Sequence, residues 1–212
     1  MIVVGRDLSP FVRRVMVSLK LTGLPHEQNP LATTTDMDRI RAINPLARVP
    51  CLLVEGEEQP LVDSWTILDY IDEQAGPEKA LIPAKGKARR AVLRLVALAM
   101  GAAEKAVQSF YERTRRPAEK QHKPWLDHLD SQVAGGLGAL DRAAGAAAAK
   151  GWPYLTGQRI TQADVSAVVA LEFVRHTAPY LAGPEAFPEL GKLAARLDAL
   201  PAFKATSLER FK

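Results

Sequence analysis

The chain has 212 residues, 47% of them hydrophobic, which is enough for a buried core in one domain or two small ones. Its formal charge is only +4, and basic and acidic residues are interspersed along most of the sequence, which argues against a nucleic-acid-binding protein. Cys51 is the single cysteine, so an internal disulfide and a dithiol redox pair are excluded.

The sequence predicts a protein of the reducing cytoplasm that does not enter a membrane. Its N-terminus lacks the basic segment and apolar stretch of a signal peptide. The most apolar later run, residues 95–103, is too short to cross a bilayer and is flanked by charged residues.

The first 75 residues alternate short apolar runs with helical patterns. The expected elements are, in chain order, strand 2–4, helix 10–21, strand 27–30, helix 35–43, strands 50–54 and 59–62, and helix 65–74. Gly23 is expected to end the first helix. The order β-α-β-α-β-β-α predicts a thioredoxin-like α/β domain over residues 1–75.

Composition changes after this domain. Residues 76–87 are rich in glycine and proline and are expected to form a linker, and residues 88–212 are expected to form an all-helical domain. The expected helices are 88–115, 117–150 with an interruption at Gly135-Gly136, 161–176 and 188–200. Thr161 followed by Asp164 predicts a capping box at the start of the third of them.

Ser9 stands between the first strand and a helix that begins at Pro10. Free N–H groups and the helix dipole favour an anion at such a helix start, including a thiolate. With no suitable cysteine in the chain, the sulfur has to come from a bound molecule. The alternative interpretation is that Ser9 only caps the helix.

Four segments together resemble the cytosolic glutathione S-transferase superfamily over nearly the whole chain. They are Ser9-Pro10-Phe11-Val12-Arg13-Arg14-Val15, Asn44-Pro45-Leu46-Ala47-Arg48-Val49-Pro50, Leu61-Val62-Asp63-Ser64 followed by Ile67, Tyr70 and Ile71, and Tyr154-Leu155-Thr156-Gly157 before Thr161 and Asp164. The resemblance implies glutathione as co-substrate. It places Ser9 beside the glutathione sulfur, where a hydroxyl donates a hydrogen bond that favours the thiolate.

The resemblance also implies which residues bind glutathione. Val49 precedes an expected cis-Pro50 and offers its backbone to the cysteinyl part of the tripeptide, as an added strand would. Arg48 is expected near the glycine carboxylate, and Asp63 and Ser64 near the γ-glutamyl group. Phe11 is expected to contribute to the same site. The alternatives are a solvated charge for Arg48 and a simple helix cap for Asp63 and Ser64.

The second substrate is expected between the two domains, beside the first long helix of the helical domain. Met100, Glu104, Val107 and Tyr111 recur at spacings of three and four residues and share one helix face, and Phe11 closes the expected pocket from the first domain. The alternative is that this stripe is ordinary core.

The cysteine, the histidines and the basic stretches are expected to have no catalytic or binding role. Cys51 is expected to be a small buried residue, and the four histidines lack metal-ligand spacing, so no metal is predicted. The basic stretches 85–90 and 113–123 lack interleaved aromatic residues, and we expect them to be solvated surface charge.

The resemblance thus implies a cytoplasmic glutathione transferase, expected to be a homodimer, that conjugates the glutathione thiolate to a small electrophile. Serine at position 9 favours conjugation over disulfide reduction, because it cannot form a mixed disulfide. Two alternatives stay open. One is a different glutathione-dependent reaction on the same fold, such as peroxide reduction, isomerisation or ether cleavage, and the other is a non-catalytic protein-interaction module.

Overall fold

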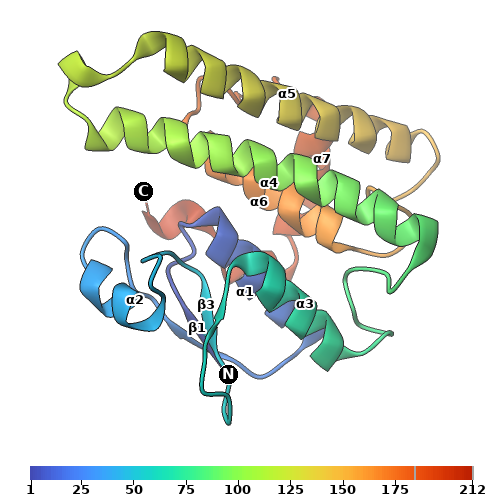
Figure 1. Ribbon diagram of the computed structural model, residues 1–212. Coiled ribbons are helices and arrows are strands. Elements are labelled where there is room, and N and C mark those ends of the chain that lie inside the picture. The colour runs from blue at the N-terminus through green and yellow to red at the C-terminus, as the bar shows by residue number, and fades with distance from the viewer. Residues whose placement is uncertain (184, 212) are drawn as a thin grey trace. The chain divides into compact units, whose positions relative to one another are not determined.

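A computed structural model of the chain describes residues 1–183 and 185–211 (Figure 1). Its contacts group the chain into two compact units. The first unit consists of Met1–Ala84 together with Leu200–Lys212, and the second of Lys85–Ala199.

The first unit contains a four-stranded mixed sheet in the order β2-β1-β3-β4. β1 (Ile2–Val4) runs parallel to β2 (Glu27–Asn29) and antiparallel to β3 (Cys51–Leu53). β4 (Leu61–Val62) extends the sheet antiparallel to β3. The short strands leave the sheet small, so that its two faces are covered by only a few helices.

Three helices alternate with the strands in the predicted order. They are α1 (Pro10–Thr22), α2 (Met37–Ile43) and α3 (Ser64–Ala75). The β-α-β-α-β-β-α order confirms the predicted thioredoxin-like fold.

The alternation of side chains along the strands divides the core of the first unit in two. Val3 and Leu52 pack into a cluster with the apolar faces of α1 and α3, whereas Val4 and Cys51 pack with Ile40 of α2 on the other side. This is the period-two pattern of strands that are covered on both faces. Cys51 is fully buried, as predicted.

The boundaries of α1 follow the sequence signals. Ser9 is the N-cap, Pro10 occupies the first turn, and Gly23 ends the helix in the left-handed conformation with φ of 75°. The Gly23 N–H donates to the Leu19 carbonyl at 3.0 Å, as expected of a glycine C-cap.

The end of the chain packs with the first unit. This segment carries α8 (Pro201–Lys204) and the 3-10 turn η2 (Leu208–Phe211), and α8 contacts α1. The buried Arg13 side chain donates from Nε to the Thr206 carbonyl at 2.9 Å. The boundaries expected from the sequence, residues 1–75, 76–87 and 88–212, place this segment with the helical domain and remain a proposal.

The second unit is helical in all its named elements, which confirms the predicted all-helical architecture. α4 (Gly86–Arg115) packs along α5 (Lys123–Ala148) and α6 (Gln162–Thr177), and α7 (Pro188–Asp198) packs against α5 and α6. A 3-10 turn, η1 (Ala118–Lys120), lies between α4 and α5.

The predicted interruption of the second long helix is wrong. α5 runs without a break through Gly135 and Gly136 and begins only at Lys123. The reason is packing, because a Cβ atom on Gly136 would lie 2.9 Å from the Ala102 Cβ and 3.3 Å from the Leu98 carbonyl oxygen of α4. Gly136 therefore permits the close approach of two helices and does not end one.

The capping box at the start of α6 is confirmed. The buried Asp164 carboxylate accepts hydrogen bonds from the Thr161 N–H at 2.8 Å and from the Leu155 N–H at 2.7 Å. These bonds join the preceding loop to the first turn of a helix that is buried on nearly all sides.

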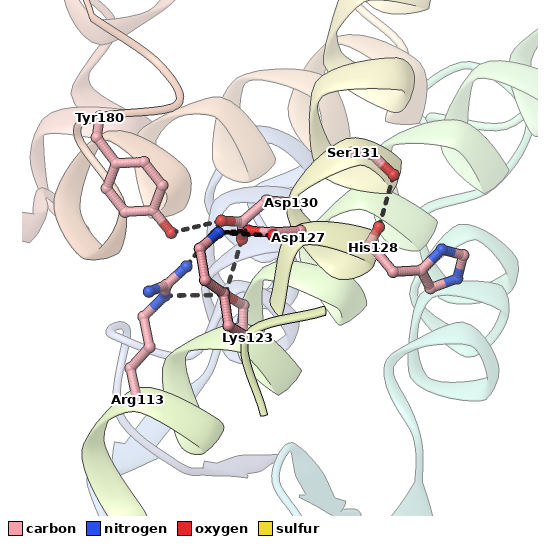
Figure 2. Close-up of polar contacts among 8 residues, drawn as sticks. Arg113, Lys123, Asp127, His128, Asp130, Ser131 and Tyr180 are labelled. Atoms are coloured by element: carbon pink, nitrogen blue, oxygen red, sulfur yellow. Dashed lines mark hydrogen bonds and ion pairs between the residues drawn. The ribbon is translucent and has the colours of Figure 1, made fainter. Parts of the chain in front are cut away.

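A polar cluster around Asp130 ties three parts of the second unit together (Figure 2). Asp130 on α5 accepts hydrogen bonds from Ser109 of α4 at 2.9 Å and from the hydroxyl of Tyr180, which follows α6, also at 2.9 Å. Arg113 of α4 forms an ion pair with Asp130 at 2.8 Å and lies over the Tyr180 ring. We call these four residues the Asp130 cluster.

No helix among the described residues is both long enough and apolar enough to span a membrane. Within residues 1–183 and 185–211, no three His, Cys, Asp or Glu side chains gather as a metal ion would require.

Candidate functional site

An open pocket lies in the first unit, with about 350 Å³ of space that is partly continuous with solvent. Residues from α1, the loop before β3, the end of β4 and the start of α3 line it. They are Phe11, Asn44, Leu46, Arg48, Val49, Pro50, Val62, Asp63 and Ser64.

The pocket brings together all six residues predicted to bind glutathione. Phe11, the segment Arg48-Val49-Pro50 and the pair Asp63-Ser64 all line it, although Phe11 and Asp63 are 52 positions apart in the sequence. Asn44, Leu46 and Val62 also line it and were not predicted as site residues. Asn44 and Leu46 precede Arg48 in the same loop, so a prediction based on the whole loop would have included them.

Ser9 is at the N-terminus of α1, two residues before Phe11, and is half-buried. Its hydroxyl oxygen accepts the Val12 N–H at 3.4 Å, which is long for a hydrogen bond. Among the described residues, no contact uses the Ser9 hydroxyl proton. Ser9 therefore caps the helix weakly and keeps its proton available for another acceptor.

Partly buried polar contacts hold the loop between β1 and Ser9. The Gln28 side-chain amide donates to the Gly5 carbonyl and to the Asp7 carboxylate, both at 2.9 Å. Asp7 itself is buried. The polar pairing fixes the backbone that leads into α1, and sequence reasoning missed it because the two side chains are 21 residues apart.

The loop before β3 is shaped by Asn44. Its buried side chain donates to the Arg48 carbonyl at 2.9 Å and accepts the Leu46 N–H at 3.0 Å. The Val49-Pro50 peptide that follows is cis, as predicted. The Val49 N–H and carbonyl have no hydrogen-bond partner among the described residues, so they are free to pair with an extended ligand.

Asp63 and Ser64 form the N-terminus of α3. Asp63 has the left-handed φ of 68°, which is rare for a residue with a side chain, and its carboxylate accepts the Trp65 N–H at 2.9 Å. Ser64 is buried and begins the helix. The pocket thus ends at a helix N-terminus, where backbone N–H groups favour a bound anion.

The ionisable residues near the pocket differ in their environment. Arg48 is exposed at its rim and is available to an anionic ligand group. Burial raises the pKa of the Cys51 thiol, which lies in the core directly after Pro50. Cys51 is therefore a protonated, inert thiol at neutral pH, and the pocket supplies no thiolate of its own.

The residues predicted to bind the second substrate on α4 have unequal environments. Met100 is buried and Glu104 is exposed, where it accepts a hydrogen bond from Gln108 at 3.3 Å. Val107 is half-buried, and Tyr111 is 37% exposed, with the Arg115 guanidinium 3.9 Å from its ring centroid. Their role in substrate binding remains a prediction.

Models of known protein families match both parts of the chain. The glutathione S-transferase N-terminal domain matches residues 3–79, which include the whole pocket, and the glutathione S-transferase C-terminal domain matches residues 123–203. No curated protein matches the chain.

Solved structures of bacterial proteins are similar over nearly the full chain. A glutathione transferase family member from Pseudomonas fluorescens with bound glutathione is 30% identical, with 97% of each chain covered and a TM-score of 0.83. A glutathione S-transferase from Methylobacterium radiotolerans in complex with glutathione sulfonate is 26% identical, with 97% of this chain and 93% of that chain covered and a TM-score of 0.88. One from Methylobacillus flagellatus with glutathione bound has a TM-score of 0.87 at 24% identity over 97% of this chain and 98% of that chain, which shows the fold.

The relative at 30% identity matches 97% of the chain in sequence and fold, and the two family models match residues 3–79 and 123–203. The chain therefore belongs to the glutathione S-transferase family.

Proposed function

We propose that the pocket of the first unit binds glutathione and that the protein transfers the glutathione thiolate to a small electrophile. The observation that carries this proposal is the convergence of Phe11, Arg48-Val49-Pro50 and Asp63-Ser64 on one pocket. Ser9 does not line that pocket, but it caps α1 two residues before Phe11. The solved relatives with glutathione or glutathione sulfonate bound support the proposal.

In this proposal the pocket binds the tripeptide in an extended conformation. The unpaired N–H and carbonyl of Val49 form strand-like hydrogen bonds with the cysteinyl residue. The N-terminus of α3, with the Ser64 hydroxyl, binds the γ-glutamyl carboxylate, and Asp63 receives the γ-glutamyl ammonium. Arg48 attracts the glycine carboxylate from the rim of the pocket.

Ser9 is the proposed catalytic residue. Its hydroxyl proton, which no described residue accepts, is donated to the glutathione sulfur. A hydrogen bond to the charged form lowers the pKa of the thiol, and the N-terminus of α1 acts in the same direction. More thiolate is then present at neutral pH to attack the electrophile and displace its leaving group.

The site for the electrophile and the state of assembly are further parts of the proposal. We propose that Phe11, Met100, Glu104, Val107 and Tyr111 line the electrophile site. We also propose that the protein acts in the cytoplasm as a homodimer, which sedimentation velocity of the purified protein tests directly.

The decisive experiment combines binding and turnover on the wild-type protein. We expect isothermal titration calorimetry to show saturable glutathione binding, and a spectroscopic assay with an aromatic halide to show glutathione-dependent conjugation. No heat of binding at millimolar glutathione would overturn the proposal and favour a non-catalytic interaction module. Binding without conjugation, accompanied by turnover of a peroxide or an isomerisable substrate, would keep the site and replace the reaction.

A further inference from the structure

Two consecutive arginines of α1, Arg13 and Arg14, are both buried, and their environments differ. Arg13 donates from Nε to the Thr206 carbonyl, so its burial is explained by the packing of the C-terminal segment on α1. The three guanidinium nitrogens of Arg14 are buried and have no hydrogen-bond partner within the described part of the chain. A buried, unpaired cation is costly for a fold, and such a group calls for a reason other than stability.

Arg14 interacts with Trp65 and Asp63, the residues on either side of Ser64. The Arg14 guanidinium lies 4.7 Å from the centroid of the Trp65 ring, within the range of a cation–π interaction. The negative charge of Asp63 also acts on it. Burial lowers the pKa of Arg14 to about 9 and the Asp63 carboxylate opposes that shift, so Arg14 is a cation at pH 7.

Of Arg14, Asp63 and Trp65, Asp63 is the residue with an unfavourable backbone conformation. Its φ of 68° is unfavourable for a residue with a Cβ atom, and such a conformation persists only where the surroundings hold it. The hydrogen bond from the Trp65 N–H restrains the Asp63 carboxylate on one side. Arg14 attracts the same carboxylate and at the same time stacks on the Trp65 side chain.

We propose that Arg14 is a positioning residue for the pocket: by stacking on Trp65 and attracting Asp63, it holds the left-handed backbone that directs Asp63 and Ser64 into the pocket. Arg14 itself does not line the pocket as described, so it acts through these neighbours. This inference rests on the proposed function, in which Asp63 and Ser64 bind the γ-glutamyl group.

If Arg14 is a positioning residue, replacing it with an uncharged side chain of similar volume should weaken glutathione binding without lowering stability. Arg14→Met fills the same space without a buried charge, so we expect the melting temperature to stay the same or to rise. Glutathione affinity is expected to fall roughly ten- to hundred-fold, the range of an interaction with a charged group. Arg14→Lys keeps the charge but loses the flat guanidinium stack and is expected to bind with intermediate affinity.

Arg13→Met is the matched control, because it removes the adjacent buried arginine. It breaks the hydrogen bond to Thr206, so it is expected to lower the melting temperature and to leave glutathione affinity unchanged. A double-mutant cycle with Asp63→Asn then tests whether Arg14 affects glutathione binding through Asp63. Since Arg14 acts through Asp63, adding Arg14→Met to Asp63→Asn is expected to cost little further affinity.

The measurements are glutathione dissociation constants by calorimetry and melting temperatures for each variant. The inference is overturned if Arg14→Met binds glutathione as tightly as the wild type. It is also overturned if the affinity losses of Arg14→Met and Asp63→Asn are fully additive in the double variant. If Arg14→Met does not fold, Arg14→Lys enters the same cycle, and additivity there is equally decisive. A wild type that does not bind glutathione overturns the proposed function instead, so the two failures are distinct.

Discussion

Gly5 lies so close to Val49 that a Cβ atom built on Gly5 would be 2.9 Å from the Val49 Cβ. The same atom would be 2.5 Å from Cγ2 of Val12. The end of β1, the first turn of α1 and the segment before the cis-proline therefore converge on a position without a side chain. This contact sets where Ser9 and the Val49 backbone lie relative to each other within the first unit.

Gly5→Ala is expected to damage both stability and the pocket. The φ of 129° at Gly5 is strained for alanine, and the added methyl group displaces Val12 or Val49. We expect a loss of about 2–4 kcal/mol in the free energy of unfolding, measured by chemical denaturation, together with weaker glutathione binding.

Gly23→Ala provides the control for this prediction. Gly23 also has a positive φ, of 75°, but a Cβ atom there would meet nothing within 4 Å. Its replacement is expected to cost about 1 kcal/mol and to leave glutathione affinity intact. Equal stability losses at the two glycines would show that the contact with Val49 is unimportant.

Ser9→Ala is expected to lower kcat/KM for conjugation roughly 10²- to 10⁴-fold, the usual cost of losing a proton-transfer or thiolate-stabilising partner. Its effect on the melting temperature is expected to be small, because the cap bond to Val12 is 3.4 Å long. The pH–rate profile is the specific readout. Without the hydroxyl donor the bound thiol ionises at a higher pH, so the rate loss is largest at low pH.

Ser131→Ala removes a hydroxyl of the second unit that donates to the His128 carbonyl at 2.7 Å (Figure 2), and serves as the control for Ser9→Ala. Its pH–rate profile is expected to match the wild type. An unchanged profile in Ser9→Ala would reduce Ser9 to a helix cap.

Ser9→Cys is expected to change the chemistry at the helix start. A thiol there has a lowered pKa, so its thiolate attacks oxidised glutathione, forms a mixed disulfide at position 9 and releases one glutathione thiolate. Cys51 is buried with a raised pKa and is expected to remain unmodified. Mass spectrometry after proteolysis locates the adduct, and the wild type, whose only thiol is Cys51, is the control. Modification of native wild type under the same conditions would contradict the inert role of Cys51.

Local signals in the sequence were sufficient for much of the fold and the site. Ser9-Pro10 and Gly23 mark the two ends of α1, because caps depend on residues next to them in the chain. Thr161 and Asp164 mark the start of α6 for the same reason. The resemblance added the pairing of the cis-proline segment with Asp63-Ser64, which no local rule contains.

Features that depend on contacts between residues far apart in the chain could not be predicted from the sequence. The sequence alone predicts a helix interruption at Gly135-Gly136, because the contact of Gly136 with Ala102 of α4 exists only after the helices pack. Asn44 was not recognised as a site residue, although its side chain fixes the loop that carries Arg48. The position of Arg14 beneath Trp65 likewise depends on how α1 meets α3, 51 residues further along the chain.

The Asp130 cluster gives a pH-dependent prediction for the second unit. Burial raises the pKa of the Tyr180 hydroxyl, and the hydrogen bond and negative charge of Asp130 raise it further, because a carboxylate disfavours a nearby phenolate. Asp130→Asn removes that charge, so Tyr180 is expected to ionise at a lower pH than in the wild type. The loss of the ion pair with Arg113 is expected to cost about 1 kcal/mol of stability as well.

The measurement is the absorbance change of tyrosinate during an alkaline titration, with Tyr180→Phe used to identify the transition that belongs to Tyr180. Asp127→Asn is the matched control, because Asp127 lies three residues before Asp130 on α5 and pairs with Lys123 at 2.6 Å (Figure 2). Its titration is expected to follow the wild type. If Asp130→Asn leaves the Tyr180 transition where it was, the carboxylate does not hold the phenol in its neutral form.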